Sequence, residues 1–274
     1  MADQAGRVAV VTGGGRGLGQ GVALGLAAAG ATVIAVARNG AQLGETEALA
    51  TGSAGSVTGM VCDVADIAAV AELGESVVAR FGPPTILVNA AGVFGPIALI
   101  ADADPTDWVR TIQIDAIAPF LTIRTFLAGM LDTGWGRIVN VTSAASLHPP
   151  GALNSAYGTA KVALNQLTRH LAAEIAGSGV TANVIHPGDV RTDMWADIRD
   201  KCDAIGSVAA GFKSWVDWVD ETGGDPPQKA VDLVLRLTAD AASDISGRFC
   251  WIDDPLQPPI ASWDVPTDER PWAK

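Results

Sequence analysis

Short apolar runs alternate with longer helical stretches along most of the chain. The apolar runs are expected to form strands, and they cover residues 7–12, 32–36, 57–62, 86–89, 137–142, 181–186 and 248–251. They are apolar at nearly every position, which is typical of parallel strands that are covered on both faces. The stretches between them predict helices over residues 17–29, 40–51, 66–81, 106–132, 154–177 and 227–239. This alternation predicts a doubly wound α/β fold, with a parallel sheet of about seven strands and helices on both faces.

Two segments depart from the alternation. Residues 190–224 are polar with scattered tryptophans, and the segment is long enough to form a lid that orders when substrate binds and excludes water. Residues 255–274 are proline-rich, so we expect an irregular tail there. Between these segments, Asp225-Pro226-Pro227 predicts a cap and the start of a helix. We see neither a linker nor an internal repeat, and we therefore expect one domain spanning residues 1–274.

The composition narrows the range of partners. Of the 274 residues, 49% are hydrophobic and 18% are charged, as in a compact soluble protein. The formal net charge of −12 argues against nucleic acid and anionic membranes as partners, because both attract basic surfaces. The three cysteines, Cys62, Cys202 and Cys250, form an odd set without metal-ligand spacing, which favours a reduced setting and no metal site. The start of the chain has no apolar signal segment and no apolar run is long enough to span a membrane, so we expect a cytoplasmic protein.

A glycine-rich loop follows the first predicted strand. It reads Thr12-Gly13-Gly14-Gly15-Arg16-Gly17-Leu18-Gly19 and leads into an apolar helix. Glycine lets the backbone approach a pyrophosphate closely, and a helix N-terminus adds amide donors and a favourable dipole. The same glycines would also serve a tight turn that needs positive φ. Five glycines in seven positions, between a strand and a helix, favour phosphate binding.

The single tyrosine, Tyr157, lies four residues before Lys161, so the two side chains project from one face of a predicted helix. A phenol has a pKa near ~10, and a cation held beside it lowers that pKa by roughly 1–3 units. Tyr157 is therefore a candidate general acid–base group. Taken alone, the pattern is equally consistent with a packing tyrosine and a solvated lysine.

Five motifs in this order resemble the short-chain dehydrogenase/reductase family. They are the glycine loop, Asn89-Ala90-Ala91-Gly92, Ser143, Tyr157-x-x-x-Lys161 and Pro187-Gly188, and they span about residues 7–250. The resemblance implies a Rossmann-type fold and a nicotinamide cofactor. It places the cofactor contacts at Gly13, Gly15, Arg16, Gly17, Leu18, Gly19, Arg38, Asp63, Val64, Asn89, Ala90, Gly92, Tyr157, Lys161, Pro187, Gly188, Val190 and Thr192.

The end of the second predicted strand bears on the choice of cofactor. In dinucleotide-binding folds an acidic residue there binds the ribose hydroxyls of NAD, whereas an arginine accepts the 2′-phosphate of NADP. Here the strand ends Val36-Ala37-Arg38, and Arg16 in the glycine loop is placed to approach the same phosphate. We expect NADP(H) in preference to NAD(H), with two solvated arginines as the alternative. Asp63 resembles the family's adenine contact, and it is equally well suited to cap a helix.

The resemblance also assigns the chemistry. Tyr157 would donate the proton in carbonyl reduction and accept it in alcohol oxidation, while Lys161 would bind the nicotinamide ribose and lower the pKa of Tyr157. Ser143 would hydrogen-bond the substrate oxygen. Asp115 stands where the family commonly has an asparagine that holds a water of a proton relay. A carboxylate there would take over the relay, pair with Lys161, or simply preserve a distortion of the helix.

Substrate contacts are expected from the loop that precedes Tyr157 and from the predicted lid. The candidates are Phe94, Ser143, Leu147, His148, Asn154, Met194 and Trp195, with Phe212, Trp215 and Trp218 further along the lid. The predicted helices over 106–132 and 154–177 are apolar on more than one face, and the family commonly pairs them between subunits. We therefore expect a homo-oligomer, a dimer or a tetramer.

These observations predict an NADP(H)-dependent oxidoreductase that interconverts a small-molecule ketone or aldehyde with an alcohol. One alternative is an NAD(H)-dependent alcohol dehydrogenase of the same family. A second is a nicotinamide-binding sensor or scaffold with little turnover, which Asp115 favours and the intact Ser143, Tyr157 and Lys161 oppose. A third is a related enzyme, such as an epimerase, that uses the cofactor transiently.

Overall fold

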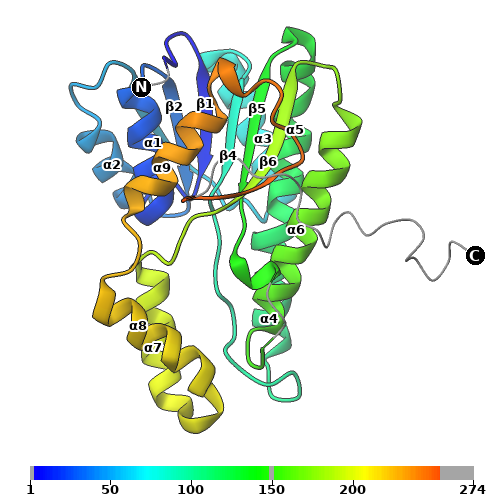
Figure 1. Ribbon diagram of the computed structural model, residues 1–274. Helices are drawn as coiled ribbons and strands as arrows, with labels where there is room; N and C mark the ends of the chain where they lie inside the picture. Colours follow the sequence, from blue (N-terminus) through cyan, green and yellow to red (C-terminus); the bar gives the residue numbers. More distant parts are fainter. Residues whose placement is uncertain (1–2, 148–150, 254–274) are drawn as a thin grey trace, which may run out of the picture.

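A seven-stranded sheet forms the centre of the protein, with strand order β3-β2-β1-β4-β5-β6-β7 (Figure 1). The computed structural model describes residues 3–147 and 151–253. All six neighbouring pairs of strands are parallel. The strands are β1 Val8–Thr12, β2 Thr32–Ala37, β3 Ser56–Val61, β4 Ile86–Asn89, β5 Gly136–Val141, β6 Val180–His186 and β7 Phe249–Trp251. The predicted α/β class and all seven predicted strands are confirmed, with ends that shift by at most one residue.

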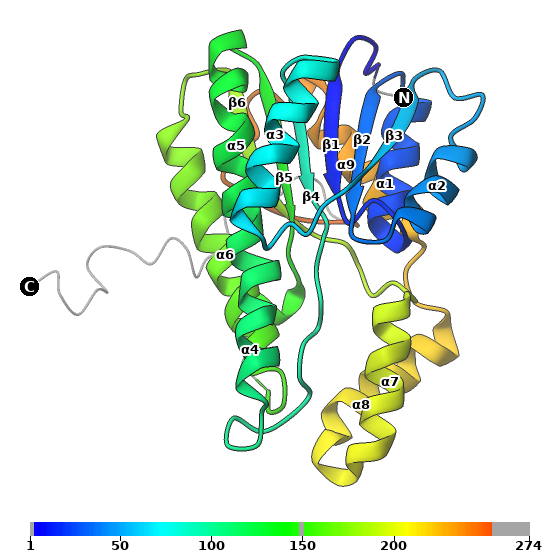
Figure 2. The same cartoon turned by 180° about the vertical axis from the view of Figure 1, so that it is seen from behind.

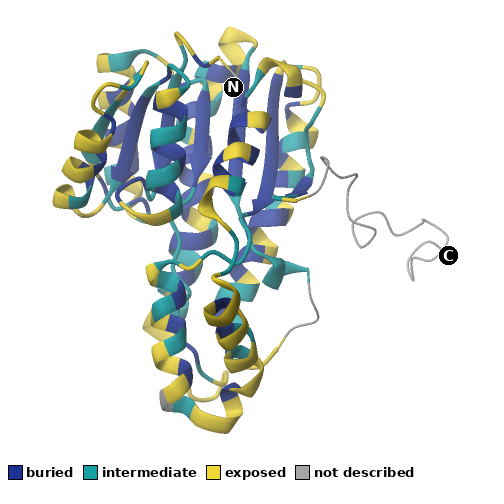
Figure 3. Ribbon diagram, turned by 60° about the vertical axis from the view of Figure 1, so that its left-hand side comes forward, coloured by how far each residue is buried: buried dark blue, intermediate teal, exposed yellow. Residues whose placement is uncertain are grey.

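Two layers of helices cover the sheet. One face packs against α1 (Gly17–Ala28) and α9 (Pro227–Leu237), and α2 (Gly40–Leu49) lies beside them near the β3 edge (Figure 1). The opposite face packs against α3 (Ile67–Phe81), α5 (Ala118–Thr133) and α6 (Ser155–Glu174) (Figure 2). The central strands are therefore buried on both sides, which explains why their sequences are apolar throughout (Figure 3).

The predicted helix over 106–132 is interrupted. It consists of α4 (Pro105–Ile112), a π-helical turn η1 (Gln113–Ile117) and α5, in one continuous helical stretch. The stretch from Pro105 to Thr133 is long and apolar enough to span a membrane, but 56% of its most apolar window is buried inside the protein. Its apolar residues cover the sheet. An isolated π turn is rare and often marks a functional site.

The segment 190–224 contains two helices that our list of predicted helices omits. They are α7 (Asp193–Ile205) and α8 (Ala210–Thr222), joined by a short 3-10 turn η3 (Gly206–Ala209). The two helices project beyond the end of the sheet as a separate arm (Figures 1 and 2). A backbone bridge between Val190 and Gly224 closes the base of this arm. Short 3-10 turns at η2 (Ala144–Ser146) and η4 (Asp240–Ala242) complete the secondary structure described.

Asp225 does not cap α9, contrary to the prediction. The residue before α9 is Pro226, and the Asp225 carboxylate instead accepts a hydrogen bond of 3.0 Å from the backbone N–H of Asp189. The backbone N–H of Asp225 in turn donates to the Asp189 carbonyl at 3.0 Å. Asp225 therefore fixes the base of the arm rather than the helix. The predicted tail 255–274 lies outside the described residues.

Candidate active site

One large cleft, of about 1550 Å³, lies at the carboxyl ends of the strands. The order in which the strands follow one another across the sheet reverses between β1 and β4. Open α/β sheets bind ligands at such a switch point. The loops that follow β1 to β6 and the arm of α7 and α8 line the cleft. It therefore gathers residues that are far apart in the sequence.

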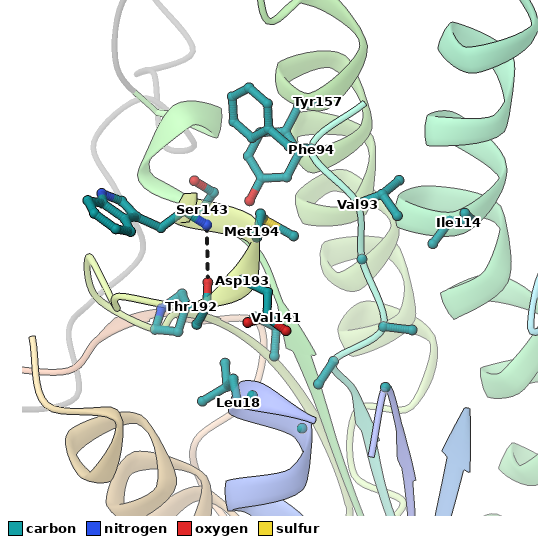
Figure 4. Close-up of a pocket in the computed structure, with 18 of the residues that line it drawn as sticks. Leu18, Val93, Phe94, Ile114, Val141, Ser143, Tyr157, Thr192, Asp193 and Met194 are labelled. Carbon is teal, nitrogen blue, oxygen red and sulfur yellow. Dashed lines mark hydrogen bonds between the residues drawn. The ribbon is translucent and has the colours of Figure 1, made fainter. Parts of the chain in front are cut away.

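Most of the site residues predicted from the sequence line this cleft. They include every predicted cofactor contact except Asn89, together with Ser143, Tyr157, Lys161, Phe94, Asn154, Met194 and Trp195. Figure 4 shows Ser143, Tyr157 and Phe94 close together, with Thr192, Asp193 and Met194 of the arm beside them. Asn89, Asp115 and Leu147 do not line the cleft, and His148 lies outside the described residues.

Asn89 is buried at the end of β4 and does not line the cleft, and its contact with the cofactor stays a prediction. It is 3% exposed, and its amide donates a hydrogen bond of 2.8 Å to Asn140 Oδ1. The side-chain oxygen Oδ1 of Asn89 accepts a hydrogen bond of 2.7 Å from the hydroxyl of Thr122 on α5. Both partners lie between the sheet and α5, away from the open edge. The neighbouring Ala90 and Ala91 reach the cleft, and their N–H groups donate to Thr12 Oγ1.

The glycine loop has the geometry of a phosphate cradle. The first helix begins at Gly17, and among the described residues no side chain caps its N-terminus. A methyl group on Gly19 would lie 2.3 Å from the Gly13 carbonyl oxygen, so this glycine is required by the tight loop itself. At Gly17, φ is +57°, and no described heavy atom would lie within 4 Å of an added methyl group. The structure therefore shows the tight turn that these glycines allow. Phosphate binding at the uncapped helix N-terminus stays a prediction.

Arg16 contacts the arm. Its guanidinium lies 2.7 Å from the carboxylate of Asp193, and both side chains are exposed. Asp193 is the first residue of α7. The hydroxyl of Thr192, the residue before it, accepts a hydrogen bond of 3.4 Å from the backbone N–H of Trp195. In this structure Asp193 holds Arg16, and the contact of Arg16 with the adenosine phosphate stays a prediction. The partner is 177 residues away in the chain, so no local pattern could reveal it.

Arg38 is exposed directly after β2, and it lines the cleft as expected. Asp63, after β3, pairs with Arg110 of α4 and accepts a hydrogen bond of 3.1 Å from the Ala65 N–H. Partial burial acts to raise the pKa of Asp63, but these hydrogen bonds and the charges of Arg110 and Arg38 outweigh it. The pKa of Asp63 therefore lies below its ordinary value. Asp63 does not cap α3, whose N-terminal cap is Asp66.

Tyr157 and Lys161 project from the first turns of α6 towards Ser143, which follows β5. Ser143 and Tyr157 lie close together in the cleft (Figure 4). The Lys161 Nζ lies 5.3 Å from the centre of the Tyr157 ring and donates a hydrogen bond of 3.0 Å to the Val141 carbonyl. The three residues that the family resemblance named are therefore brought together by the end of β5 and one helix, α6.

Asp115 acts on this group through Lys161. It lies in the π turn, is fully buried, and places Oδ2 3.1 Å from Lys161 Nζ. Its Oδ1 accepts a hydrogen bond of 2.9 Å from the Val93 N–H. Of the three expectations for this residue, the structure shows both the pairing with Lys161 and the helix distortion. Asp115 does not touch the cleft, so it is a positioning residue and not a catalytic one.

The electrostatic balance at Tyr157 differs from the expectation. Burial raises the pKa of the phenol, although the open cleft leaves part of the ring accessible. The charge of Lys161 lowers this pKa, the charge of Asp115 raises it, and the net result is a pKa above the ordinary value. For Lys161, burial acts to lower the pKa, but Asp115 and Tyr157 together raise it above its usual value. Burial likewise raises the pKa of Asp115 against the opposing charge of Lys161.

The arm supplies further lining residues that the sequence did not single out. Ile198 of α7, Val208 of the η3 turn and Gly211 of α8 join Phe212 and Trp215 along the cleft. Leu147, predicted as a substrate contact, ends the η2 turn and does not line it. Trp218 lies on the outer side of α8 and is 46% exposed. The apolar spacing of α7 and α8 could have indicated these helices, but their frequent acidic residues obscured it.

This parallel sheet, with a glycine loop at its switch point and a serine, a tyrosine and a lysine in the same cleft, defines a dinucleotide-binding type of oxidoreductase fold. Residues 7–203 match the family model described as short chain dehydrogenase. The chain belongs to the short-chain dehydrogenase/reductase family.

Individual relatives agree with this assignment. The chain is 34% identical to the short chain dehydrogenase mpl6 of Monascus purpureus, over 96% of this chain and 82% of that protein. It is 33% identical to 2-keto-3-deoxy-L-fuconate dehydrogenase of Xanthomonas campestris pv. campestris, over 90% and 79% of the two chains. Among solved structures, a putative NAD(P)-dependent gluconate 5-dehydrogenase from Beutenbergia cavernae, with bound NADP at low occupancy, is 33% identical with a TM-score of 0.78. That match covers 92% of this chain and 96% of the other.

Proposed function

We propose that this protein is an NADP(H)-dependent oxidoreductase that interconverts a small-molecule ketone or aldehyde with an alcohol. The observation that carries the proposal is the position of Tyr157, which lies beside Lys161 and lines the same cleft as Ser143 and the open N-terminus of α1. Membership of a family of nicotinamide-dependent dehydrogenases supports it.

The residues of the chain divide the work as follows. The nicotinamide, when bound, supplies or accepts the hydride. The N–H groups at the start of α1 would hold the pyrophosphate. The Ser143 hydroxyl orients the substrate oxygen, and Tyr157 Oη gives that oxygen a proton in reduction or takes one in oxidation. The Lys161 ammonium, held between Asp115 and the Val141 carbonyl, offsets part of the effect of burial on the phenol.

The preference for NADP(H) rests on Arg38. It follows β2 as an exposed cation at the edge of the cleft, where an NAD-binding member would carry an acidic residue. Arg38 and Asp63 line the same cleft, and the charge of Arg38 is one of the influences that lower the pKa of Asp63. An extra phosphate group would meet this charge, whereas the hydroxyls of NAD would find no carboxylate at the end of β2 itself.

We further propose that α7 and α8 act as a lid and that the protein forms a homo-oligomer. The lid joins the sheet through a narrow base, at Val190 with Gly224 and at Asp189 with Asp225. A small set of exposed apolar side chains on α4 to α6, namely Val109, Ile117, Phe120 and Val162, offers a surface for a second copy of the chain.

A turnover assay with a panel of carbonyl compounds tests the function. The wild-type protein should oxidise NADPH in the presence of a carbonyl, whereas Tyr157→Phe should lose about 100-fold to 10,000-fold in kcat and still bind NADPH. Trp218→Phe, on the outside of α8, is the matched aromatic control and should keep full activity. Equal turnover by the wild-type protein and Tyr157→Phe would refute the assignment. Binding of NADPH without any turnover would support a sensor, and product formation without net cofactor oxidation would support an epimerase.

A further inference from the structure

Aromatic side chains extend from the candidate acid–base group into the lid. The ring centres of Tyr157 and Phe94 lie 4.8 Å apart, with an angle of 32° between the planes. The ring of Phe212 on α8 packs edge-on against Phe94, with 5.7 Å between the ring centres and an angle of 90° between the planes. Figure 4 shows Phe94 directly beside Tyr157. A substrate whose carbonyl reaches Ser143 and Tyr157 therefore lies along an aromatic wall.

The lid side of the cleft is also apolar. Trp195, Ile198 and Val216 of the lid form a small core with Ile97 and Leu153, and Met194, Phe212 and Trp215 pack against it. Met194, Trp195, Ile198 and Trp215 line the cleft at the same time. The lid thus presents aromatic and aliphatic side chains towards the catalytic end, while Asp200, Asp203, Asp217 and Asp220 form ion pairs at exposed positions.

Charged groups are placed unfavourably for an anionic substrate. Among the described residues, the cations that line the cleft are Arg16, Arg38 and Lys161. Arg16 is paired with Asp193, Lys161 is paired with Asp115, and Arg38 lies at the end of β2. A carboxylate on the substrate would meet no available cation beside Tyr157.

A polyhydroxylated substrate would also lack partners. Beyond Ser143 and Tyr157, the polar side chains on the lid side of the cleft are Asn154, Asp189, Thr192 and Asp193, with the indoles of Trp195 and Trp215. The Thr192 hydroxyl already caps α7 and Asp193 is paired with Arg16, which leaves Asn154 and Asp189 to meet several hydroxyls. A buried hydroxyl that loses water without gaining a partner weakens binding.

One polar group of the lid remains without a partner. Trp195 is 3% exposed, and among the described residues its indole N–H has no hydrogen-bond partner. A buried donor of this kind is unfavourable unless an acceptor reaches it. Trp195 lines the cleft but its indole nitrogen is itself buried in this structure, so a bound substrate supplies that acceptor when the lid residues around the nitrogen shift.

Resting on the proposed function, we propose that the substrate is an uncharged ketone, or the corresponding alcohol, that carries an apolar ring and a second oxygen. The ring packs against Phe94, Phe212 and Trp215, the carbonyl to be reduced meets Ser143 and Tyr157, and the second oxygen accepts a hydrogen bond from the Trp195 indole N–H. This class differs from the sugar acids in the names of two relatives, 2-keto-3-deoxy-L-fuconate and gluconate.

Four carbonyl probes with NADPH test the class. Acetophenone and para-diacetylbenzene carry an aromatic ring, fructose is polyhydroxylated, and ketogluconate is anionic. We expect kcat/KM for the two aryl ketones to exceed that for fructose and ketogluconate by about tenfold or more. An equal or higher value for either sugar would overturn the proposal and leave the oxidoreductase function intact.

Binding separates this inference from the proposed function. In cofactor-loaded Tyr157→Phe, quenching of tryptophan fluorescence should report binding of the aryl ketones at concentrations where fructose and ketogluconate have no effect. This readout does not need turnover, so inactivity towards all four probes would count against the function alone. Absence of aryl ketone binding would count against the inference.

Two variants test the walls. Phe212→Ala should lower kcat/KM for both aryl ketones about tenfold or more, whereas Trp218→Ala, on the exposed side of the same helix, should not. Trp195→Phe retains a ring and removes the N–H. We expect it to reduce the preference for para-diacetylbenzene over acetophenone about tenfold. An unchanged preference would remove Trp195 from the site, and equal effects of Phe212→Ala and Trp218→Ala would remove the aromatic wall.

Discussion

The carboxylate of Asp115 and the ammonium of Lys161 form a buried ion pair, with 3.1 Å between Oδ2 and Nζ. The pair lies one step behind Tyr157, because Lys161 faces the phenol ring and Asp115 does not reach the cleft. Lys161 lowers the pKa of Tyr157 and Asp115 raises it. The acid–base behaviour of the site therefore depends on a carboxylate that cannot touch the substrate.

Asp115→Asn should move the ascending limb of the pH–rate profile for alcohol oxidation to lower pH. Oxidation needs the phenolate of Tyr157, whose pKa is raised by burial and by the Asp115 charge. Because the rate rises with pH towards that pKa, removal of the negative charge should increase oxidation near neutral pH by about three- to tenfold. The measurement is initial rate against pH for both proteins.

Asp107→Asn is the matched control, because Asp107 is an exposed carboxylate on the adjoining helix α4. It should leave the profile unchanged. Unchanged turnover and an unchanged limb in Asp115→Asn would show that Asp115 only maintains the π turn. A uniform loss of rate at every pH would instead show that the ion pair holds Lys161 in place.

Arg38→Ala should weaken NADPH far more than NADH. The lost charge-assisted contact to a phosphate corresponds to about a tenfold or larger increase in Kd for NADPH. Isothermal titration with both cofactors measures the difference. Arg16→Ala is the comparison variant, and it should have the smaller effect because Asp193 holds Arg16 in this structure. Equal losses for NADPH and NADH in Arg38→Ala would refute the phosphate contact.

The sequence predicted the sheet well because burial on both faces leaves only apolar residues in its central strands. It could not place the π turn, since one additional residue in the turn leaves the apolar pattern of 106–132 almost unchanged. It also could not separate Asn89 from Ala90. Both follow the fourth strand in the motif, but only the structure shows that the Asn89 amide turns towards Asn140 and Thr122.

The remaining site features depend on contacts between distant parts of the chain. Ser143, Tyr157 and Lys161 were recognisable because their spacing resembles a known family. The partner of Arg16 and the lining residue Ile198 of α7 have no comparable signal. Each acquires its position only when α7 and α8 fold over the end of the sheet, and their sequences carry acidic residues suited to the exposed side.

Gly19→Ala should disrupt the phosphate cradle. The new methyl group would lie 2.3 Å from the Gly13 carbonyl oxygen, so the loop must shift. We expect a loss of about 1–3 kcal/mol in the free energy of unfolding and weaker binding of both cofactors. Gly44→Ala in α2 is the control, since no described heavy atom would lie within 4 Å and its φ is not positive. That change should be neutral or stabilise by about 0.5–1 kcal/mol, and equal destabilisation by both variants would contradict the steric argument.

Phe120→Asp should dissociate the proposed oligomer. Phe120 lies in the first turn of α5 and is 46% exposed. The exposed Val109 and Val162 lie on the neighbouring helices α4 and α6. A carboxylate in the centre of an apolar interface would lose its hydration without gaining a partner, and this cost opposes association. Light scattering after size exclusion should show a dimer or tetramer for the wild-type protein and a smaller species for the variant. Leu49→Asp, at an exposed apolar position at the end of α2 on the opposite side of the sheet, should keep the wild-type mass. A monomeric wild-type protein, or dissociation by Leu49→Asp alone, would show that α4 to α6 do not form the interface.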